Sequence, residues 1–242
     1  MRTVKDAWMM VQSEYRGNKL KLVWASLFSI FYMGYIAFFV GIMMNEIVQS
    51  NEGHMAVDIM LLSITPLMGF VLNRSAFKYW SEDSYTRMLV YFKSLPIPAT
   101  VILCKRKIMS VIAFSINGTL CFGLIYAFSK NMRAEMDLGD YIAFTITWIG
   151  YGLIVTGLYI TFELLFSGKI YLVLTLAVLI VAFGVAFLVQ MGGGNLFLYT
   201  ILCSQEWGLL SPLMWGTLLV GMASVQVFSK WTIHRLKSRD LL

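Results

Sequence analysis

Residues 170–189 read IYLVLTLAVLIVAFGVAFLV, a stretch without a single charged side chain. A helix of this length extends about 30 Å, which matches the hydrocarbon core of a bilayer. The stretch is therefore expected to cross a membrane as one helix.

The rest of the chain has the same character. Of its 242 residues, 59% are hydrophobic and only 13% are charged, and the mean hydropathy is +0.74. Six apolar runs are long enough to span a bilayer. They lie at about 22–44, 55–73, 108–129, 140–163, 170–189 and 212–229. The expected fold class is an all-α polytopic membrane protein with six transmembrane helices, a single domain with no room for a separate soluble one.

Charged residues predict the orientation. With the N-terminus in the cytoplasm, every Lys and Arg except Lys130 and Arg133 falls on the inner side. Acidic residues gather on the outer side, at Glu46, Glu52, Asp58, Glu135, Asp137, Asp140 and Glu206. The positive-inside rule then places both termini in the cytoplasm. This topology separates Cys104, Cys121 and Cys203, so no disulfide within the chain is expected.

Several functions are excluded by missing motifs. The chain has no Walker-type or Rossmann glycine motif, no zincin motif and no catalytic Ser/His constellation. His54 and His234 are predicted on opposite sides of the membrane, so they cannot share a metal site. The basic residues flank apolar spans, which argues against a nucleic-acid partner. We expect a multi-pass protein of a prokaryotic cell membrane that is not an enzyme and has no cofactor of its own.

The longest connection contains WSEDSYTRMLVYFKSLPIP at residues 80–98. Its apolar side chains recur at helical spacing, at Tyr85, Met88, Leu89 and Phe92. Glu82 and Asp83 suit the first turn of a helix, and Pro96 prevents its continuation. A short amphipathic helix at 80–94 is expected, resting on lipid headgroups or docking to a soluble partner. Acids near one end, with Arg87 and Lys93 further along, favour the protein partner.

Residues 3–17 predict a second amphipathic helix, which ends at Gly17. The residues on its apolar stripe are Val4, Trp8, Val11 and Tyr15. Because Trp and Tyr favour the membrane interface, we expect this helix to lie in the headgroup plane.

Three polar or helix-breaking residues stand out in the spans. Pro66 should free a backbone carbonyl near Leu62 and kink the second span. Asn117 is expected to hydrogen-bond a neighbouring helix or to line a path. Glu163 is interpreted as an interfacial carboxylate that reaches toward headgroups or Lys169; a role in ion coupling is the alternative.

The outer segment 190–211 is too long for a tight turn and too apolar for a solvated loop. Three glycines at 192–194 should end the fifth span. Residues 196–202 are expected to form a short re-entrant helix before Pro212 opens the sixth span. We interpret the segment as an outer lid.

The segment between the second and third spans, together with the topology, resembles the permease subunit of an ABC-2 type ABC transporter. The pattern is ED-x-x-TR-x-L followed by SLPI, carried by Glu82, Asp83, Thr86, Arg87, Leu89, Ser94, Leu95, Pro96 and Ile97. The basic residues at 105–107 match the family's start of the third span. Tyr85 stands where the family often has glycine.

This resemblance implies that 80–94 is a coupling helix in a groove of a separate cytosolic ATPase, which binds ATP and magnesium. The residues implied at the ATPase are Glu82, Asp83, Tyr85, Thr86, Arg87, Met88, Leu89, Phe92 and Lys93, with Ser167, Gly168 and Lys169 as a smaller contact. A second permease, identical or related, would complete the path for an exported amphiphilic peptide, drug or lipid-like molecule.

Small residues spaced for close span packing or for lining the path are Ala37, Gly41, Ala182 and Ala186. Two other functions stay open on sequence grounds. The chain could be a self-sufficient transporter or channel, or a membrane-embedded regulatory or sensor subunit.

Overall fold

A computed structural model of the chain describes residues 2–17, 19–50, 54–70 and 97–238. These ranges are helical and contain no β-strand. The helices are α1 (Arg2–Gly17), α2 (Lys19–Ser50), α3 (Met55–Leu67), α5 (Ala99–Phe128), α6 (Lys130–Glu135), α7 (Leu138–Leu165), α8 (Gly168–Met191), α9 (Leu196–Trp207) and α10 (Pro212–Ser238), with a 3₁₀ turn at Gly208–Leu210. The predicted helix at 80–94, with its nine ATPase-contact residues from Glu82 to Lys93, lies outside the described residues.

Within the part of the chain that the structure describes, five helices are long and apolar enough to cross a membrane, namely α2, α5, α7, α8 and α10. The prediction of an all-helical, multi-pass membrane protein is confirmed at this level. The predicted second span, 55–73, begins with α3, an apolar helix of 13 residues. At about 20 Å it is shorter than a bilayer core. Residues of that span beyond 70 lie outside the description, so a sixth crossing stays a prediction.

Helix boundaries follow local chemistry. The third span was predicted to begin at 108, but α5 already begins at Ala99, directly after Pro98. Its first turns therefore carry the basic residues 105–107. Helix α8 ends at Met191 with Gly192 as its C-cap, as the glycine run predicted. The short helix predicted at 196–202 is α9, which runs further than predicted and ends at Trp207.

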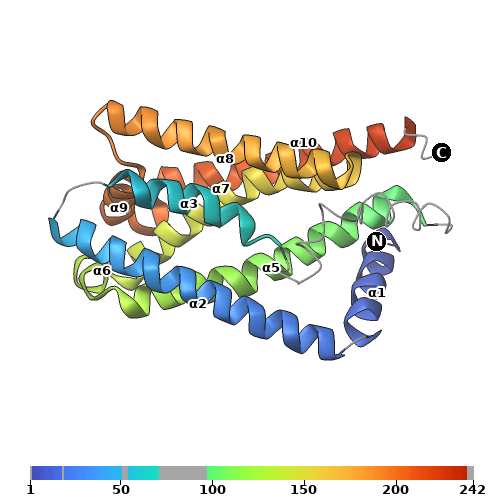
Figure 1. The fold of residues 1–242 in the computed structure, drawn as a ribbon, viewed down its shortest axis with the longest axis horizontal. Coiled ribbons are helices and arrows are strands. Elements are labelled where there is room, and N and C mark those ends of the chain that lie inside the picture. The colour runs from blue at the N-terminus through green and yellow to red at the C-terminus, as the bar shows by residue number, and fades with distance from the viewer. Residues whose placement is uncertain (1, 18, 51–53, 71–96, 239–242) are drawn as a thin grey trace.

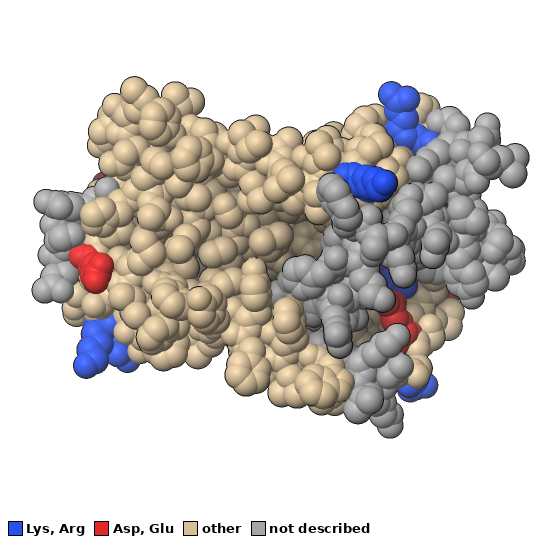
Figure 2. Space-filling model, viewed as in Figure 1, with Lys and Arg blue, Asp and Glu red and all other residues tan. Residues whose placement is uncertain are grey.

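The helices run mainly along the long axis of the molecule (Figure 1). Helix α1 lies across this axis at one end, beside the start of α5. The C-terminal end of α10 lies at this same end, whereas α6 and α9 occupy the opposite end. On the face drawn in Figure 2, charged side chains gather toward the two ends and leave a broad uncharged band between them. This distribution suits a chain whose middle contacts hydrocarbon and whose ends contact water.

Helix α7 is central and packs most extensively against α10. Their contact is lined by small residues that bring the two backbones close together. A Cβ added at Gly221 would lie 2.6 Å from the carbonyl oxygen of Gly150. Beside this point, the Ser224 hydroxyl donates a hydrogen bond of 2.8 Å to the carbonyl of Ile154. Because lipid is as apolar as the side chains, membrane helices associate through such close van der Waals packing rather than through the hydrophobic effect.

Helix α1 packs on α5. Ala7 and Val11 are buried, whereas Val4 and Trp8 of the predicted stripe are exposed. The exposed Val4 and Trp8 leave an apolar surface on α1 that is free for lipid.

Helix α8 buries only four residues, and two of them are Ala182 and Ala186. Its packing partner is chiefly α3. Large apolar side chains such as Ile180 and Leu188 point outward from it. An apolar helix exposed in this way is suited to a lipid environment.

Candidate functional site

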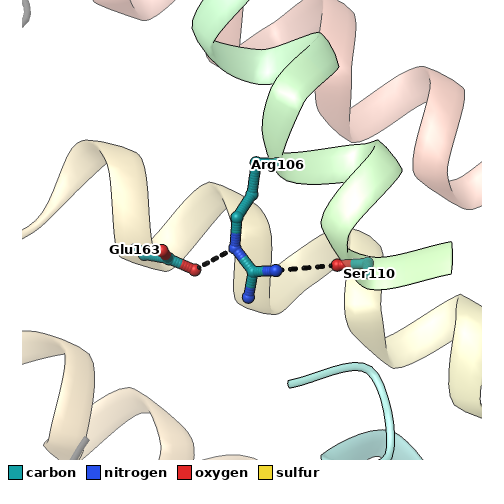
Figure 3. Close-up of polar contacts among 3 residues, drawn as sticks. All are labelled: Arg106, Ser110 and Glu163. Atoms are coloured by element: carbon teal, nitrogen blue, oxygen red, sulfur yellow. Dashed lines mark hydrogen bonds and ion pairs between the residues drawn. The ribbon is translucent and has the colours of Figure 1, made fainter. Parts of the chain in front are cut away.

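A largely buried ion pair joins α5 to α7 (Figure 3). The Nε–H of Arg106 donates to Oε2 of Glu163 at 2.7 Å, and the exposed fractions of the two side chains are 14% and 9%. A hydrogen bond between two charged groups is among the strongest a protein makes. It also removes the cost of leaving either charge alone in an apolar setting.

Arg106 contacts two further groups. Its Nη1 donates to the hydroxyl of Ser110, one turn along α5, at 2.9 Å. Its guanidinium lies over the ring of Phe70, 5.0 Å from the ring centroid, where the negative face of the ring attracts a cation. The Phe70 ring in turn packs on Tyr159 of α7 at 5.5 Å. One arginine thus contacts α5, α7 and the residues that follow α3.

The interpretation of Glu163 as a carboxylate reaching toward headgroups or Lys169 was wrong. Lys169 is exposed at the start of α8, and Glu163 faces α5 instead. The partner could not be read from spacing, because Arg106 is 57 positions away in the sequence. The one hint to this partner in the sequence was the basic cluster 105–107, which was predicted on the same, cytoplasmic side of the membrane as Glu163.

An apolar cluster lies beside the ion pair and fixes which segments meet there. It consists of Ile102, Leu103, Ile160, Leu164 and Leu236. These residues come from the first turns of α5, the last turns of α7 and the last turns of α10. The start of α5, the turn before α8 and the end of α10 therefore lie at one end of the molecule.

Helix α1 is attached at this same end. Lys105 forms an ion pair with Glu14, with 2.7 Å between Nζ and Oε2, and the Glu14 side chain is half exposed. Burial, and after it the neighbouring Glu14 carboxylate, raises the pKa of Tyr15, so this phenol stays neutral. Because solvent reaches the half-exposed Glu14, the pair adds little stability, and the buried Ala7 and Val11 contribute more to holding α1.

The second ATPase contact implied by the resemblance is the turn between α7 and α8. Ser167 is the N-cap residue of α8, but its side chain makes no capping hydrogen bond. Gly168 is buried and Lys169 is exposed. Only four positions separate Glu163 from Ser167, so the ion pair lies one helical turn from this loop.

Asn117 lies near the middle of α5 and is buried. Its side-chain amide donates to the carbonyls of Met68 and Phe70 at 3.0 and 3.1 Å, and its oxygen accepts from the hydroxyl of Ser29. The amide therefore satisfies backbone carbonyls where α3 ends and ties them to α2 and α5. Pro66 lies in the last turn of α3, and the carbonyl of Leu62 accepts from another helix instead.

The four small residues singled out in the spans all lie at contacts within the chain. Ala37 is buried, and the carbonyl of Gly41 accepts a hydrogen bond of 2.7 Å from the Ser129 hydroxyl that follows α5. Ala182 and Ala186 belong to the same buried cluster as residues of α3.

No group of three or more His, Cys, Asp or Glu side chains suited to a metal ion occurs within residues 2–17, 19–50, 54–70 and 97–238. The ion pair itself offers no nucleophile activated by a base. Its chemistry is that of a polar link between helices, which can be made or broken when they move. Comparison with protein-family models, curated proteins and solved structures finds no match to this chain.

Proposed function

We propose that this chain is the membrane-spanning permease subunit of an ATP-driven ABC transporter of the ABC-2 type. It exports an amphiphilic peptide, drug or lipid-like substrate by alternating access. A separate cytosolic ATPase binds ATP and magnesium, and a second permease, identical or related, completes the path. The end that carries α1 and the end of α10 faces the cytoplasm.

The observation that carries the proposal is the Arg106–Glu163 ion pair. Arg106 lies on the helix that follows segment 71–96, and Glu163 lies one turn before the loop at Ser167. These are the two places where the resemblance puts the ATPase. A buried charge pair between them is a rigid connection through which force on one contact reaches the other.

The distribution of charge supports the same orientation. Of the 14 Lys and Arg within the described residues, nine lie in α1, the first turns of α5 and the last turns of α10, for example Arg16, Lys107 and Arg235. At the other end Lys130 and Arg133 stand among a larger number of acids. The positive-inside rule places the first end in the cytoplasm.

The proposal is tested at the predicted coupling helix. Replacing Met88 and Leu89 with Asp puts charge where an apolar groove is expected, which usually costs several kcal/mol at a buried site. The protein should still insert, but it should lose the cytosolic ATPase that co-purifies with it and lose substrate-stimulated ATP hydrolysis.

Arg87→Glu serves as the matched control for this experiment. A charge at the rim of an interface acts mainly on the association rate and on salt sensitivity, so this variant should weaken the complex less. If no ATPase co-purifies with the unaltered chain, or if the double variant keeps full ATPase binding and transport, the proposal fails.

One observation favours a second candidate, a self-sufficient ion-coupled carrier. Glu163 is a buried carboxylate on a helix that is apolar enough to span a membrane, and such groups often serve proton or ion movement. A carrier of this type would transport substrate in liposomes without an ATPase, driven by a pH gradient. Glu163→Gln would abolish that transport, whereas the ABC mechanism predicts no gradient-driven transport at all.

A further inference from the structure

Helix α9 lies at the end opposite to α1 and uses one face to contact the protein. Phe197, Thr200, Ile201 and Ser204 are buried, while Tyr199, Leu202 and Trp207 are exposed. The ring of Phe197 meets that of Phe144 on α7 edge to face, with centroids 5.9 Å apart. The helix therefore covers the aromatic residues of α7 at this end.

The N-terminus of α9 is held by a side chain from another helix. The first N–H groups of any helix have no partner inside it. Here the carboxylate of Asp58 accepts from the N–H groups of Leu196 and Phe197 at 2.9 and 2.8 Å. Asn195, the N-cap residue, accepts from Leu198 at 2.9 Å. Two of the three capped N–H groups thus depend on α3.

Asp58 has no contact with solvent, although it lies in the first turn of its own helix. Burying a carboxylate is costly unless charge-assisted hydrogen bonds hold it. The two amides and the positive end of the α9 dipole supply that compensation. Because both of these hydrogen bonds go to α9, the buried carboxylate of Asp58 fastens α9 to α3.

The segments on either side of α9 can act as hinges. Gly193 and Gly208 adopt positive φ angles of 73° and 51°, a conformation that residues with a side chain rarely adopt. At its C-terminal end, the side chain of Gln205 in α9 donates a hydrogen bond of 2.8 Å to the carbonyl of Glu135. A rigid helix between two such glycines can move as one unit when its N-terminal bonds break.

We propose that Asp58 is the latch that holds α9, as a hinged lid, onto α3 and over the aromatic residues of α7. Opening of the lid requires the two hydrogen bonds at Leu196 and Phe197 to break together. The role of this lid at the outer mouth of a transport path rests on the proposed function. The latch itself does not, and it is tested on the isolated chain.

The test measures how fast a buried cysteine on α9 reacts with a membrane-impermeant maleimide. The chain is placed in lipid nanodiscs, which leave both faces accessible, after Cys104, Cys121 and Cys203 have been replaced by Ala. Thr200→Cys supplies the buried reporter, and Leu202→Cys supplies the exposed one. Asp58→Ala should accelerate labelling at 200 by about tenfold or more, because hydrogen bonds to charged groups rank among the stronger ones. Labelling at 202 should stay the same.

Asp137→Ala is the matched control, since this exposed carboxylate precedes α7 without capping it. It should leave both labelling rates unchanged. Asp58→Asn keeps the shape and one acceptor of the side chain, so its rate at 200 should fall between those of the parent and Asp58→Ala. If Asp58→Asn and Asp58→Ala label at 200 as slowly as the parent, the latch does not exist. If both variants are lost to aggregation, Asp58 holds the fold as a whole, and the proposal is likewise overturned.

Discussion

The hydroxyl of Tyr151 on α7 donates a hydrogen bond of 3.0 Å to the backbone carbonyl of Leu62 on α3. In a regular helix this carbonyl would accept from the N–H of residue 66, but that residue is Pro66, which has none. Because Leu62 is buried, water cannot take the place of the missing donor. Helix α7 thus supplies, through Tyr151, the hydrogen-bond donor that Pro66 removes from α3.

This relationship predicts a result for a double-mutant cycle. Tyr151→Phe alone leaves a buried acceptor unsatisfied and should lower the free energy of unfolding by roughly 1–3 kcal/mol. In a Pro66→Ala background, the new N–H at 66 can bond the Leu62 carbonyl, so Tyr151→Phe should cost clearly less. The free energy of unfolding of all four proteins is measured in mixed micelles.

Tyr35→Phe is the control for this cycle, because it removes the same hydroxyl from an exposed tyrosine on α2. It should be close to neutral. An equal cost of Tyr151→Phe with and without Pro66 would show that the hydroxyl does not compensate for the proline.

Features that depend on local sequence were predictable. The charge-free run at 170–189 became α8, and the glycine at 192 ended it. The carbonyl freed by Pro66 was also foreseen, because a proline acts on the residue four positions earlier. In each case the cause and the effect lie within one turn or one span, so a pattern in the sequence contains both.

Tertiary partners were not predictable. Tyr151 and Leu62 are 89 positions apart, and Asp58 is 138 positions from Leu196. A single sequence shows that Asp58 or Glu163 is an unusual residue, but not which helix it faces. The same limit applies to α1, because the sequence did not show that this helix packs on α5.

The close contact between α7 and α10 predicts that one methyl group added there strongly lowers the stability of the protein. A Cβ at Gly150 would lie 2.7 Å from Oγ1 of Thr217 and 2.8 Å from the backbone nitrogen of Leu218. Backbone atoms cannot yield easily, so Gly150→Ala should destabilise the protein by about 1–3 kcal/mol. The thermal midpoint of the protein in detergent is the measurement.

Gly184→Ala is the matched control on α8, where an added Cβ meets nothing within 4 Å. It should be neutral or slightly stabilising, since alanine favours a helix more than glycine does. Equal midpoints for the Gly150 and Gly184 variants would show that α7 and α10 are less tightly packed than this close contact implies.

The proposed orientation predicts the pattern of labelling by an impermeant thiol reagent in intact cells. Single cysteines at 50, 134 and 205 should react from outside, because these positions lie at the end that carries α6 and α9. Single cysteines at 90 and 168 should not react from outside, and one at the exposed position of Lys169 should react once the cells are opened. External labelling at 168 would reverse the orientation and would remove the turn at Ser167 as an ATPase contact.

The ion pair of Arg106 and Glu163 predicts that stability and coupling can be separated. Arg106→Met leaves a buried carboxylate without its cation and should cost about 3–5 kcal/mol in the free energy of unfolding. Adding Glu163→Met removes the orphaned charge, so most of that loss should be recovered. Lys105→Met is the control, because its exposed partner Glu14 makes that pair worth only about 0–1 kcal/mol.

The same double variant separates a structural role of the pair from a role in transmission. If the pair transmits force between segment 71–96 and the turn at Ser167, the Met/Met protein should fold and bind its ATPase, yet substrate should no longer stimulate ATP hydrolysis. An apolar contact can replace the packing of the pair, but not its directional bond between α5 and α7. Full substrate stimulation in the Met/Met protein would mean that the ion pair only satisfies its own buried charges. The connection between the two proposed ATPase contacts would then have to run through the apolar cluster beside it, and Leu164→Ala would be the variant that interrupts it.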